Sequence, residues 1–284
     1  MVAVPRMQID ARLVDDRGAV TAFLRRDRLY AAYPLGDLDA RGRERSTFAM
    51  AYDIDGRPIA LAMHQEGLVP QPLFVMGDAE GCAAILADVV RPREAYFAAR
   101  IEHQRALATH YELDTPSLLL RMSVDRATFT PVDGPAERLR GRDIDALNRL
   151  YQLGFAARLP ASVLEDWIYY GVWERGRLVA AAGTHAISVD EGVAVVGNVM
   201  THADRRGRGF AKAVTGAVTE ELLEAVPDVV LNVHADNVPA VAAYARLGYR
   251  EYCRLVERLG RRRSTGMRLM RPLREAIRLT WPRN

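Results

Sequence analysis

Hydrophobic and polar residues follow two patterns along the chain, and together they predict a regular succession of helices and strands. Apolar residues recur three and four positions apart in some stretches and form short runs in others. The helices predicted on this basis cover residues 19–30, 79–89, 101–110, 143–153, 162–170, 210–226 and 238–247. The predicted strands cover 73–76, 93–100, 117–124, 193–201, 229–233, 249–259 and 266–270, with hairpins at 48–65 and 172–188. This mixture predicts a protein of the α/β (α+β) class.

The same order of elements occurs twice. One hairpin turns at Asp55-Gly56, a strong hairpin signal, and the other at Arg175-Gly176. The two turn glycines lie 120 residues apart (176 − 56), and so do Gly77 and Gly197 (197 − 77), each of which we take to follow the next strand. Proline and glycine at residues 130–135 predict a linker. We therefore expect a tandem duplication with one domain over 1–128 and a second over 129–284.

Composition and charge narrow the functional classes. Of the 284 residues, 49% are hydrophobic and 26% are charged, as in ordinary globular proteins. A net charge of +3 is too small to predict nucleic-acid binding. Residues 1–18 lack a signal-peptide core, and no apolar run approaches the ~18 residues of a membrane span. We expect a cytoplasmic protein with no nucleic-acid or membrane partner, in which the distant cysteines Cys82 and Cys253 are buried and unreactive.

One stretch, HADRRGRGFAKA at residues 202–213, concentrates cations and glycines between a predicted strand and a predicted helix. A helix N-terminus presents unpaired N–H groups and partial positive charge, so it favours an anion. Gly207 and Gly209 would let a phosphate approach the backbone, and Arg205, Arg206 and Arg208 add charge. A pyrophosphate suits several converging N–H groups. The alternative is a solvated basic turn.

The spacing of this stretch excludes two familiar phosphate loops. It contains neither GxxxxGK[ST] nor GxGxxG. What remains is R-G-R-G-F-A at residues 206–211, which fits [RQ]-x-x-G-x-[GA] and resembles the pyrophosphate loop of the GNAT superfamily of acyl-coenzyme A dependent N-acetyltransferases. A second segment, NVPAVAAYARLGY at residues 237–249, resembles the N-x-x-A-x-x-x-Y-x-x-x-G-[FY] segment of the same family. The resemblance covers residues 178–259.

The resemblance implies a fold and a coenzyme A site. Each half would be a GNAT-like fold with a mixed, mostly antiparallel central sheet flanked by helices. The strand ending in Val199, Met200 and Thr201 would splay from its neighbour near Val233, and coenzyme A would enter the gap. Asn237 would contact the pantetheine arm or fix its own helix, since Asn also reads as an N-cap. The backbone that would hold the pyrophosphate comprises Gly207, Arg208, Gly209, Phe210, Ala211 and Lys212, with Arg206 as the position-matched cation.

Tyr244 falls at the tyrosine position of the family and is the expected catalytic residue. There it would protonate the leaving thiolate. The alternative is a packing role, since Ala240, Tyr244 and Leu247 share helical spacing. A backbone N–H of Val199 or Met200 would stabilise the oxyanion. The general base stays open among His185, His202, His234, Glu165, Glu174 and a water chain.

The first half lacks these motifs. Its counterpart of the phosphate loop, GDAEGCAAIL from Gly77, carries Asp78 and Glu80 and no arginine, and carboxylates repel a pyrophosphate. We therefore expect a degenerate GNAT-like domain that walls the acceptor site or forms a dimer. The turn-like segment 33–39 is expected to be a helix start or simple turn, and Arg261–Arg263 a solvated hairpin tip.

The predicted function is transfer of an acetyl (acyl) group from acetyl-coenzyme A to a primary amine by direct attack in a ternary complex. The acceptor would be a small-molecule or peptide amine, no metal would take part, and the protein could form a homodimer. No cysteine lies in a matched motif to carry an acyl-enzyme intermediate. The first alternative is a catalytically weak acyl-coenzyme A binding or regulatory module. The second is a basic protein that contacts nucleic acid, with steeply salt-dependent binding.

Overall fold

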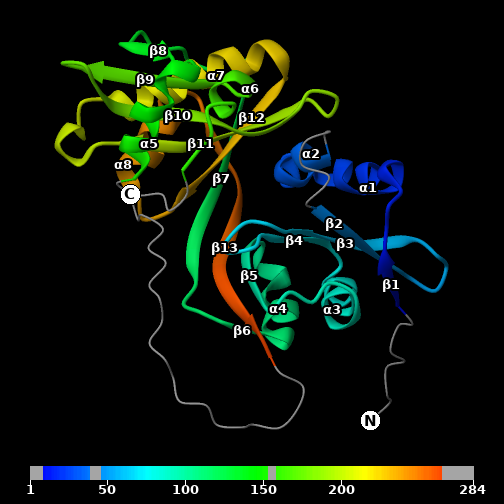
Figure 1. Cartoon of the computed structure of the whole chain (residues 1–284). Coiled ribbons are helices and arrows are strands. Elements are labelled where there is room, and N and C mark those ends of the chain that lie inside the picture. Colours follow the sequence, from blue (N-terminus) through cyan, green and yellow to red (C-terminus); the bar gives the residue numbers. More distant parts are fainter. Residues whose placement is uncertain (1–8, 39–45, 153–157, 264–284) are drawn as a thin grey trace, which may run out of the picture. The chain divides into compact units, whose positions relative to one another are not determined.

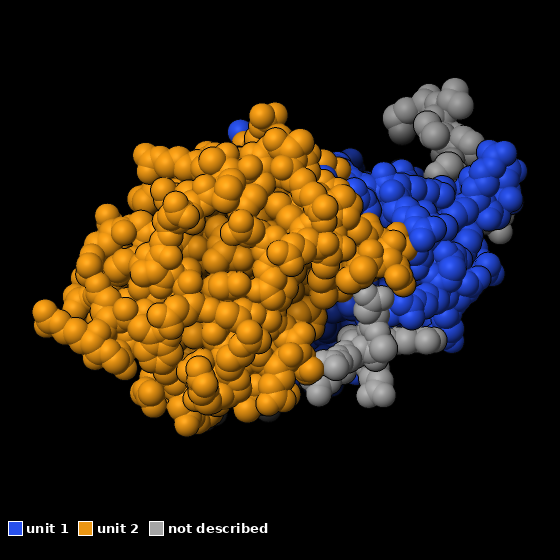
Figure 2. Space-filling model, turned by 90° about the horizontal axis from the view of Figure 1, so that it is seen from above, with its two compact units in different colours: residues 1–119, 253–267 blue, residues 120–252, 268–284 orange. Residues whose placement is uncertain are grey.

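The computed structural model describes residues 9–38, 46–152 and 158–263. The chain divides into two compact units, coloured separately in Figure 2. Among the described residues, unit 1 consists of those up to Leu119 together with those from Cys253 onward, and unit 2 runs from Leu120 to Tyr252. None of the helices in this described part of the chain has the length and hydrophobicity needed to cross a membrane.

Unit 1 is built on an antiparallel sheet with strand order β1-β2-β3-β4 (Figure 1). Its hairpin turns at Gly56, whose φ is 75°. Between β4 and β5 there is an isolated parallel bridge, Pro72 with Tyr96. The elements are β1 (Asp10–Leu13), α1 (Arg17–Leu24), η1 (Arg25–Asp27), α2 (Ala32–Leu38), β2 (Ser46–Tyr52), β3 (Pro58–Gln65), β4 (Leu73–Gly77), α3 (Ala79–Asp88), β5 (Glu94–Ala99), η3 (Ile101–His103), α4 (Gln104–His110) and β6 (Tyr111–Leu113).

The core of unit 1 lies between this sheet and helix α3. Cys82, Ile85 and Leu86 recur at helical spacing on α3 and are fully buried. They pack against alanines of β2 and β3. Burial also raises the pKa of the Cys82 thiol to about 12, so the thiol stays protonated and unreactive as predicted. Cys253 is only partly buried.

Unit 2 has strand order β7-β12-β11-β10-β9-β8, with β11 and β12 parallel and antiparallel pairs from β11 through β8 (Figure 1). Its hairpin turns at Gly176, whose φ is 73°. The elements are β7 (Ser117–Asp125), β8 (Ala136–Arg138), η4 (Gly141–Asp143), α5 (Ile144–Tyr151), α6 (Val163–Asp166), β9 (Tyr169–Glu174), β10 (Arg177–Ser188), β11 (Val193–Thr201), η5 (Ala203–Arg205), α7 (Phe210–Ala225), β12 (Asp228–His234), α8 (Val238–Ala245) and β13 (Arg250–Arg262).

Both faces of the unit 2 sheet are covered by helices. Val214, Val218 and Leu222, spaced four apart on α7, are fully buried in a cluster that also contains residues of α8. Helices α5 and α6 supply a second cluster with Leu178, Ala181 and Met200. Because strand residues alternate between faces, Met200 belongs to the α5 cluster while Val199 packs against the α7 cluster.

Two strands cross the boundary between the units. Strand β7 starts in unit 1 and continues into unit 2 at Leu120, and β13 starts in unit 2 and continues into unit 1 at Cys253. Within unit 1, residues 256–261 of β13 pair antiparallel with residues 99–94 of β5. The division of the chain therefore lies elsewhere than the predicted boundary at 128/129, and unit 1 includes a segment from the end of the described chain.

The two halves also share a short identical sequence, which the spacing of the hairpin glycines did not reveal. Arg28-Leu29-Tyr30 and Arg149-Leu150-Tyr151 are identical tripeptides 121 residues apart (149 − 28). In each unit the tyrosine hydroxyl donates to a backbone carbonyl of the strand that precedes the long helix: Tyr30 to Val75 at 2.7 Å, and Tyr151 to Asn198 at 2.6 Å. The predicted equivalence of Gly77 and Gly197 in the repeat was wrong, because Gly77 ends β4 whereas Gly197 lies inside β11.

The α/β class and the predicted order of elements are confirmed, with local corrections. The segment 162–170 is a short helix followed by the start of β9, and not one helix. Residues 33–38 lie in helix α2. Arg261 and Arg262 belong to β13 rather than to a hairpin tip, and Arg261 pairs with Glu94 at 3.1 Å. The predicted strand at 266–270 lies outside the described residues.

Candidate functional site

The parallel strands β11 and β12 pair along only part of their length. Their ladder runs from Val193 with Asp228 to Val196 with Leu231. Strand β11 continues to Thr201 and stays paired with β10, and β12 continues to His234. The predicted divergence of β11 from β12 near Val199 and Val233 thus coincides with the end of their ladder.

A β-bulge lies where β11 leaves β12. Gly197 pairs with Gly183 and Met200 with Ala181, so Asn198 and Val199 together face the single residue Ala182 of β10. Asn198 has a φ of 54°, in the left-handed region that Asn tolerates better than most residues. The bulge therefore marks the point at which the two strands separate.

Strand alternation decides which backbone groups of β11 face the gap. His202 N–H donates to the carbonyl of Val179, 2.8 Å away, so the N–H groups of His202 and Met200 both point toward β10. The N–H of Thr201 consequently points to the opposite side, toward β12. The irregular backbone of the bulge is at Asn198 and Val199 keeps strand geometry, so one further step back from Met200 gives the Val199 N–H the same direction as that of Thr201. Of the two predicted oxyanion donors, the alternation leaves Val199 in place and turns Met200 away.

The basic glycine stretch forms the turn before helix α7. Gly207 and Gly209 have φ values of 77° and 79°, and a Cβ added at either would meet nothing within 4 Å. Gly209 is the N-cap of α7 and has no side chain to bond the first turn. The first bond of the helix runs from the N–H of Ala213 to the carbonyl of Gly209, so the N–H groups of residues 210–212 point forward, out of the helix.

Two arginines of this turn are held by a carboxylate that the sequence did not single out for this role. Glu174, at the end of β9, forms ion pairs with Arg205 at 2.7 Å and with Arg208 at 2.6 Å. The three side chains line a hollow together with Arg175. The Arg208 guanidinium also lies 4.8 Å from the centre of the Phe210 ring. Glu174 therefore acts as a counter-ion of the turn, which argues against its role as a general base.

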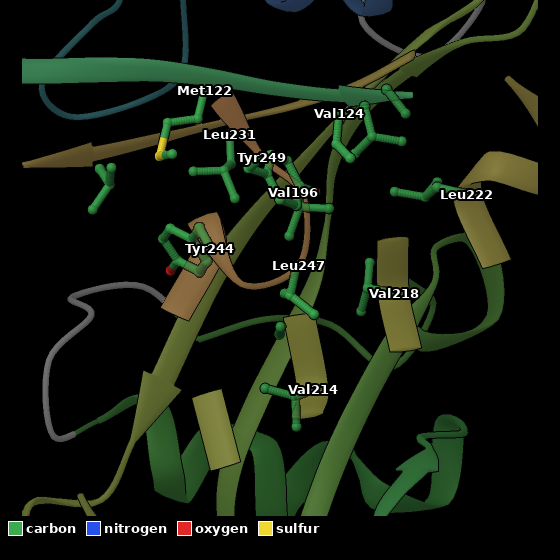
Figure 3. Close-up of a cluster of buried hydrophobic side chains, with 14 of the residues drawn as sticks. Met122, Val124, Val196, Val214, Val218, Leu222, Leu231, Tyr244, Leu247 and Tyr249 are labelled. Atoms are coloured by element: carbon green, nitrogen blue, oxygen red, sulfur yellow. The ribbon is translucent and has the colours of Figure 1, made fainter. Parts of the chain in front are cut away.

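Tyr244 lies on α8 in the main cluster of unit 2, 6% exposed (Figure 3). Its ring lies 6.2 Å from the ring of Tyr249, and Leu247 belongs to the same cluster. Burial raises the pKa of the Tyr244 phenol to about 12, so it is protonated at neutral pH. A protonated phenol can donate a proton but cannot serve as a base, which fits the predicted acid role and is equally compatible with packing.

Asn237 is the N-cap of α8. Its Oδ1 accepts from the N–H of Ala240 at 3.3 Å, and its own N–H donates to the carbonyl of His234. Pro239 in the first turn has no N–H to satisfy there. The capping reading is confirmed, while a contact with pantetheine stays a prediction.

The remaining candidate bases are in different settings. Both ring nitrogens of His202 are engaged: Nδ1 accepts from the N–H of Asp204 at 3.3 Å, and Nε2 lies 3.1 Å from Arg177. The His185 ring lies over Gly197 on the neighbouring strand. Glu165 lies beside Gly141, on the turn that precedes α5. His202 thus caps a turn, and no base is selected among the others.

In unit 1 the N-terminus of the corresponding helix, α3, is capped by a carboxylate side chain. Asp78 is the N-cap of α3, and its Oδ1 accepts from the N–H groups of Glu80 and Gly81, each at 2.9 Å. These are the groups that an external phosphate would need. The first turn of α3 is therefore already bonded by a side chain of the chain itself, and the absence of a phosphate site in the first half stays a prediction. In the described residues, no three His, Cys, Asp or Glu side chains are grouped as metal ligands would be.

Comparisons with known proteins agree with this arrangement. Residues 169–259 match the family model described as FR47-like protein. Among solved structures, a GCN5-related N-acetyltransferase from Sphaerobacter thermophilus is 17% identical with a TM-score of 0.59, over 91% of this chain and 98% of that one. A tandem GNAT protein from the clavulanic acid biosynthesis pathway is 13% identical with a TM-score of 0.54, over 89% and 98%.

A third structure, a putative acetyltransferase of the GNAT family from Novosphingobium aromaticivorans, is 20% identical with a TM-score of 0.51. It covers 68% of this chain and 88% of its own. No curated protein matches. At these identities the structural matches establish the fold, and the family model adds the segment that contains the turn before α7, Asn237 and Tyr244. The chain therefore has a fold like that of tandem GNAT proteins, and its residues 169–259 match the FR47-like family model.

Proposed function

We propose that unit 2 binds acetyl-coenzyme A and transfers its acetyl group to a primary amine. The observation that carries the proposal is the start of α7, where open space beside Gly207 and Gly209 meets a first helical turn without a side-chain cap. A pyrophosphate there would accept from the N–H groups of residues 210–212 and gain from the positive end of a 16-residue helix. Coenzyme A would supply the activated acetyl thioester.

The residues of unit 2 would divide the chemistry among them. The Val199 N–H faces the side on which β11 and β12 separate, where it would donate to the thioester carbonyl oxygen. The amine nitrogen bonds to the carbonyl carbon as the carbon–sulfur bond breaks. Tyr244 O–H would give its proton to the departing sulfur, and the amine proton would pass to a base or to water. The acceptor is proposed to be a small-molecule or peptide amine.

Thermal unfolding with and without acetyl-coenzyme A tests the binding step. At about 100 times its dissociation constant a ligand adds ~2.7 kcal/mol, which is several degrees for a domain of this size. We expect the wild type to shift and Gly209→Glu not to shift, because a carboxylate would occupy the open space. Gly56→Glu is the matched control, since Gly56 also has positive φ and open space but lies in the unit 1 hairpin. A missing shift in the wild type would contradict the proposal.

A second candidate is an acyl-coenzyme A binding module without efficient transfer. It is favoured by the engagement of His202 and Glu174 in turn and ion-pair contacts. A panel of amines with detection of released thiol separates the two. Turnover that disappears in Tyr244→Phe while coenzyme A affinity is unchanged supports the transferase, and binding without turnover on any amine supports the module.

A further inference from the structure

The bulge of β11 is held by two buried tyrosines from different elements. Tyr151 of α5 donates its hydroxyl hydrogen to the Asn198 carbonyl at 2.6 Å. The Asn198 amide donates to the hydroxyl oxygen of Tyr169 at 2.9 Å, and Tyr169 is the first residue of β9. Each tyrosine is 2% exposed. The residue with positive φ is thus bonded through both its main chain and its side chain.

The neighbouring strand is shaped to admit this arrangement. Gly183 of β10 lies opposite Gly197, and a Cβ at Gly183 would come within 2.4 Å of the Tyr169 ring. Any other residue at 183 would therefore displace the ring that receives the Asn198 amide. Burial raises the pKa of Tyr169 to about 12 and that of Tyr151 well above its ordinary value, so both phenols keep their hydrogen at neutral pH.

Unit 1 contains half of this arrangement, which provides an internal reference. Tyr30 matches Tyr151 within the repeated tripeptide and also donates to a strand carbonyl, that of Val75. The positive-φ residue of β4 is its last, Gly77, which lies beyond Val75. The bond from this tyrosine to a strand carbonyl is therefore common to both units, although Tyr30 lies in the turn before α2 and Tyr151 at the end of α5. Attachment of the bond to a left-handed bulge residue is specific to unit 2.

We propose that Tyr151 and Tyr169 are positioning residues that act through Asn198 to hold the Val199 N–H toward the thioester carbonyl, and so make the site prefer acyl-coenzyme A over free coenzyme A. This inference rests on the proposed function. Free coenzyme A has the same pyrophosphate and pantetheine but no carbonyl at sulfur. The orientation of one N–H group therefore affects the acylated form alone.

The test compares the dissociation constants of acetyl-coenzyme A and coenzyme A by calorimetry, which needs no acceptor. We expect the wild type to bind acetyl-coenzyme A about fivefold more tightly, the factor for one neutral hydrogen bond. In Tyr151→Phe this ratio should fall to about one while the constant for coenzyme A changes less than twofold. Tyr30→Phe, which removes a similar buried bond in unit 1, should leave the ratio at its wild-type value.

A second pair of variants addresses the bulge while leaving both tyrosine side chains in the sequence. Asn198→Gly accepts positive φ and keeps the carbonyl bonded by Tyr151 but loses the amide bond to Tyr169, so it should keep part of the ratio, whereas Asn198→Ala also disfavours positive φ and should lose the ratio. This pair decides the matter if Tyr151→Phe does not fold. The carbonyl resonance of bound acetyl-coenzyme A labelled with ¹³C should move toward its free position in Tyr151→Phe.

The outcomes separate the two proposals. A wild type that binds neither form overturns the proposed function and this inference with it. A wild type that binds both, with a ratio unchanged in Tyr151→Phe and Asn198→Ala, overturns the positioning role alone. Equal losses of affinity for both forms in Tyr151→Phe would also overturn it, because they would indicate general damage to the site.

Discussion

Helix α3 of unit 1 and helix α7 of unit 2 follow the same succession of strands, but the N–H groups of their first turns differ in whether a side chain of the chain bonds them. The Asp78 carboxylate bonds two N–H groups of α3. Gly209 leaves the first turn of α7 open, with space in front of it. A single side chain at the N-cap thus separates a helix that is finished within the chain from one that is available to an external anion.

The glycines before the two helices differ in the same way. All have positive φ, but a Cβ at Gly77 would lie 2.3 Å from the Ile59 carbonyl oxygen, whereas one at Gly207 or Gly209 would meet nothing. The Gly77 position is therefore required by packing. The two glycines before α7 are required by their positive φ and not by packing, and the space in front of them stays open.

The largest effect is expected for Gly77→Ala. The overlap with the Ile59 carbonyl and the unfavourable φ should together lower the free energy of unfolding by roughly 3–4 kcal/mol. Urea unfolding measures this loss. Gly207→Ala, which adds the same methyl group into open space, should lower stability by only ~1 kcal/mol. Equal losses in the two variants would contradict the distinction.

Gly209→Asp should give α7 the finished start that α3 has. The carboxylate would compete with the pyrophosphate for the same N–H groups and repel it, so the dissociation constant of coenzyme A should rise at least about 100-fold, or ~2.7 kcal/mol. Calorimetry measures this. Gly209→Asn has a neutral side chain of the same shape and should weaken binding less. An affinity for Gly209→Asp within threefold of the wild type would show that the site lies elsewhere.

The stability of the protein should fall at alkaline pH in a way that depends on Tyr244 of α8. Tyr244 of α8 has a pKa raised by burial to about 12, against ~10 in the unfolded chain. Between these values the unfolded state binds fewer protons, so the stability from buried Tyr244 is complete below pH ~10 and is lost as pH rises toward 12. From pH 9 to 11 the wild type should lose ~1.4 kcal/mol more than Tyr244→Phe. Parallel losses would be inconsistent with this, and Tyr52→Phe in unit 1 is the control.

The smallest effect is expected for Asp78→Ala. Removal of the cap should lower stability by ~1 kcal/mol, measured by urea unfolding. It should leave coenzyme A affinity unchanged, because the proposed site is in unit 2. Asp78→Asn should retain most of the stability, since Asn caps helices as well as Asp does. A gain of a second coenzyme A site in Asp78→Ala would show that the cap alone prevents binding in unit 1.

Local patterns predicted much of this fold. Apolar spacing located α3, α7 and α8 within one or two residues, and Asp55-Gly56 and Arg175-Gly176 marked both hairpins. These signals depend on neighbours in sequence. The motif around Gly207 and Gly209 predicted the start of α7, because a helix start without a side-chain cap depends only on the residues next to it in the sequence.

Contacts between distant residues could not be predicted in this way. Nothing near Glu174 in the sequence indicates that it holds Arg205 and Arg208, and nothing near Asn198 indicates a bond to Tyr151. The repeated Arg-Leu-Tyr tripeptide was a usable signal that the glycine spacing obscured. The segment 162–170 was misread because its short helix and the following strand together resemble one helical period.

The course of β13 has a consequence for how the chain is made. Ala99 of β5 pairs with Val256, 157 residues later (256 − 99), so an emerging unit 1 must wait for the last described strand before its pairing is complete. Ordering so long an intervening segment slows folding and leaves the edge of β5 open in the meantime. A fragment that ends at residue 128 would therefore be an unfinished protein rather than a domain. If the two units arose by duplication, this exchange of strands now makes it impossible to separate them by a single cut.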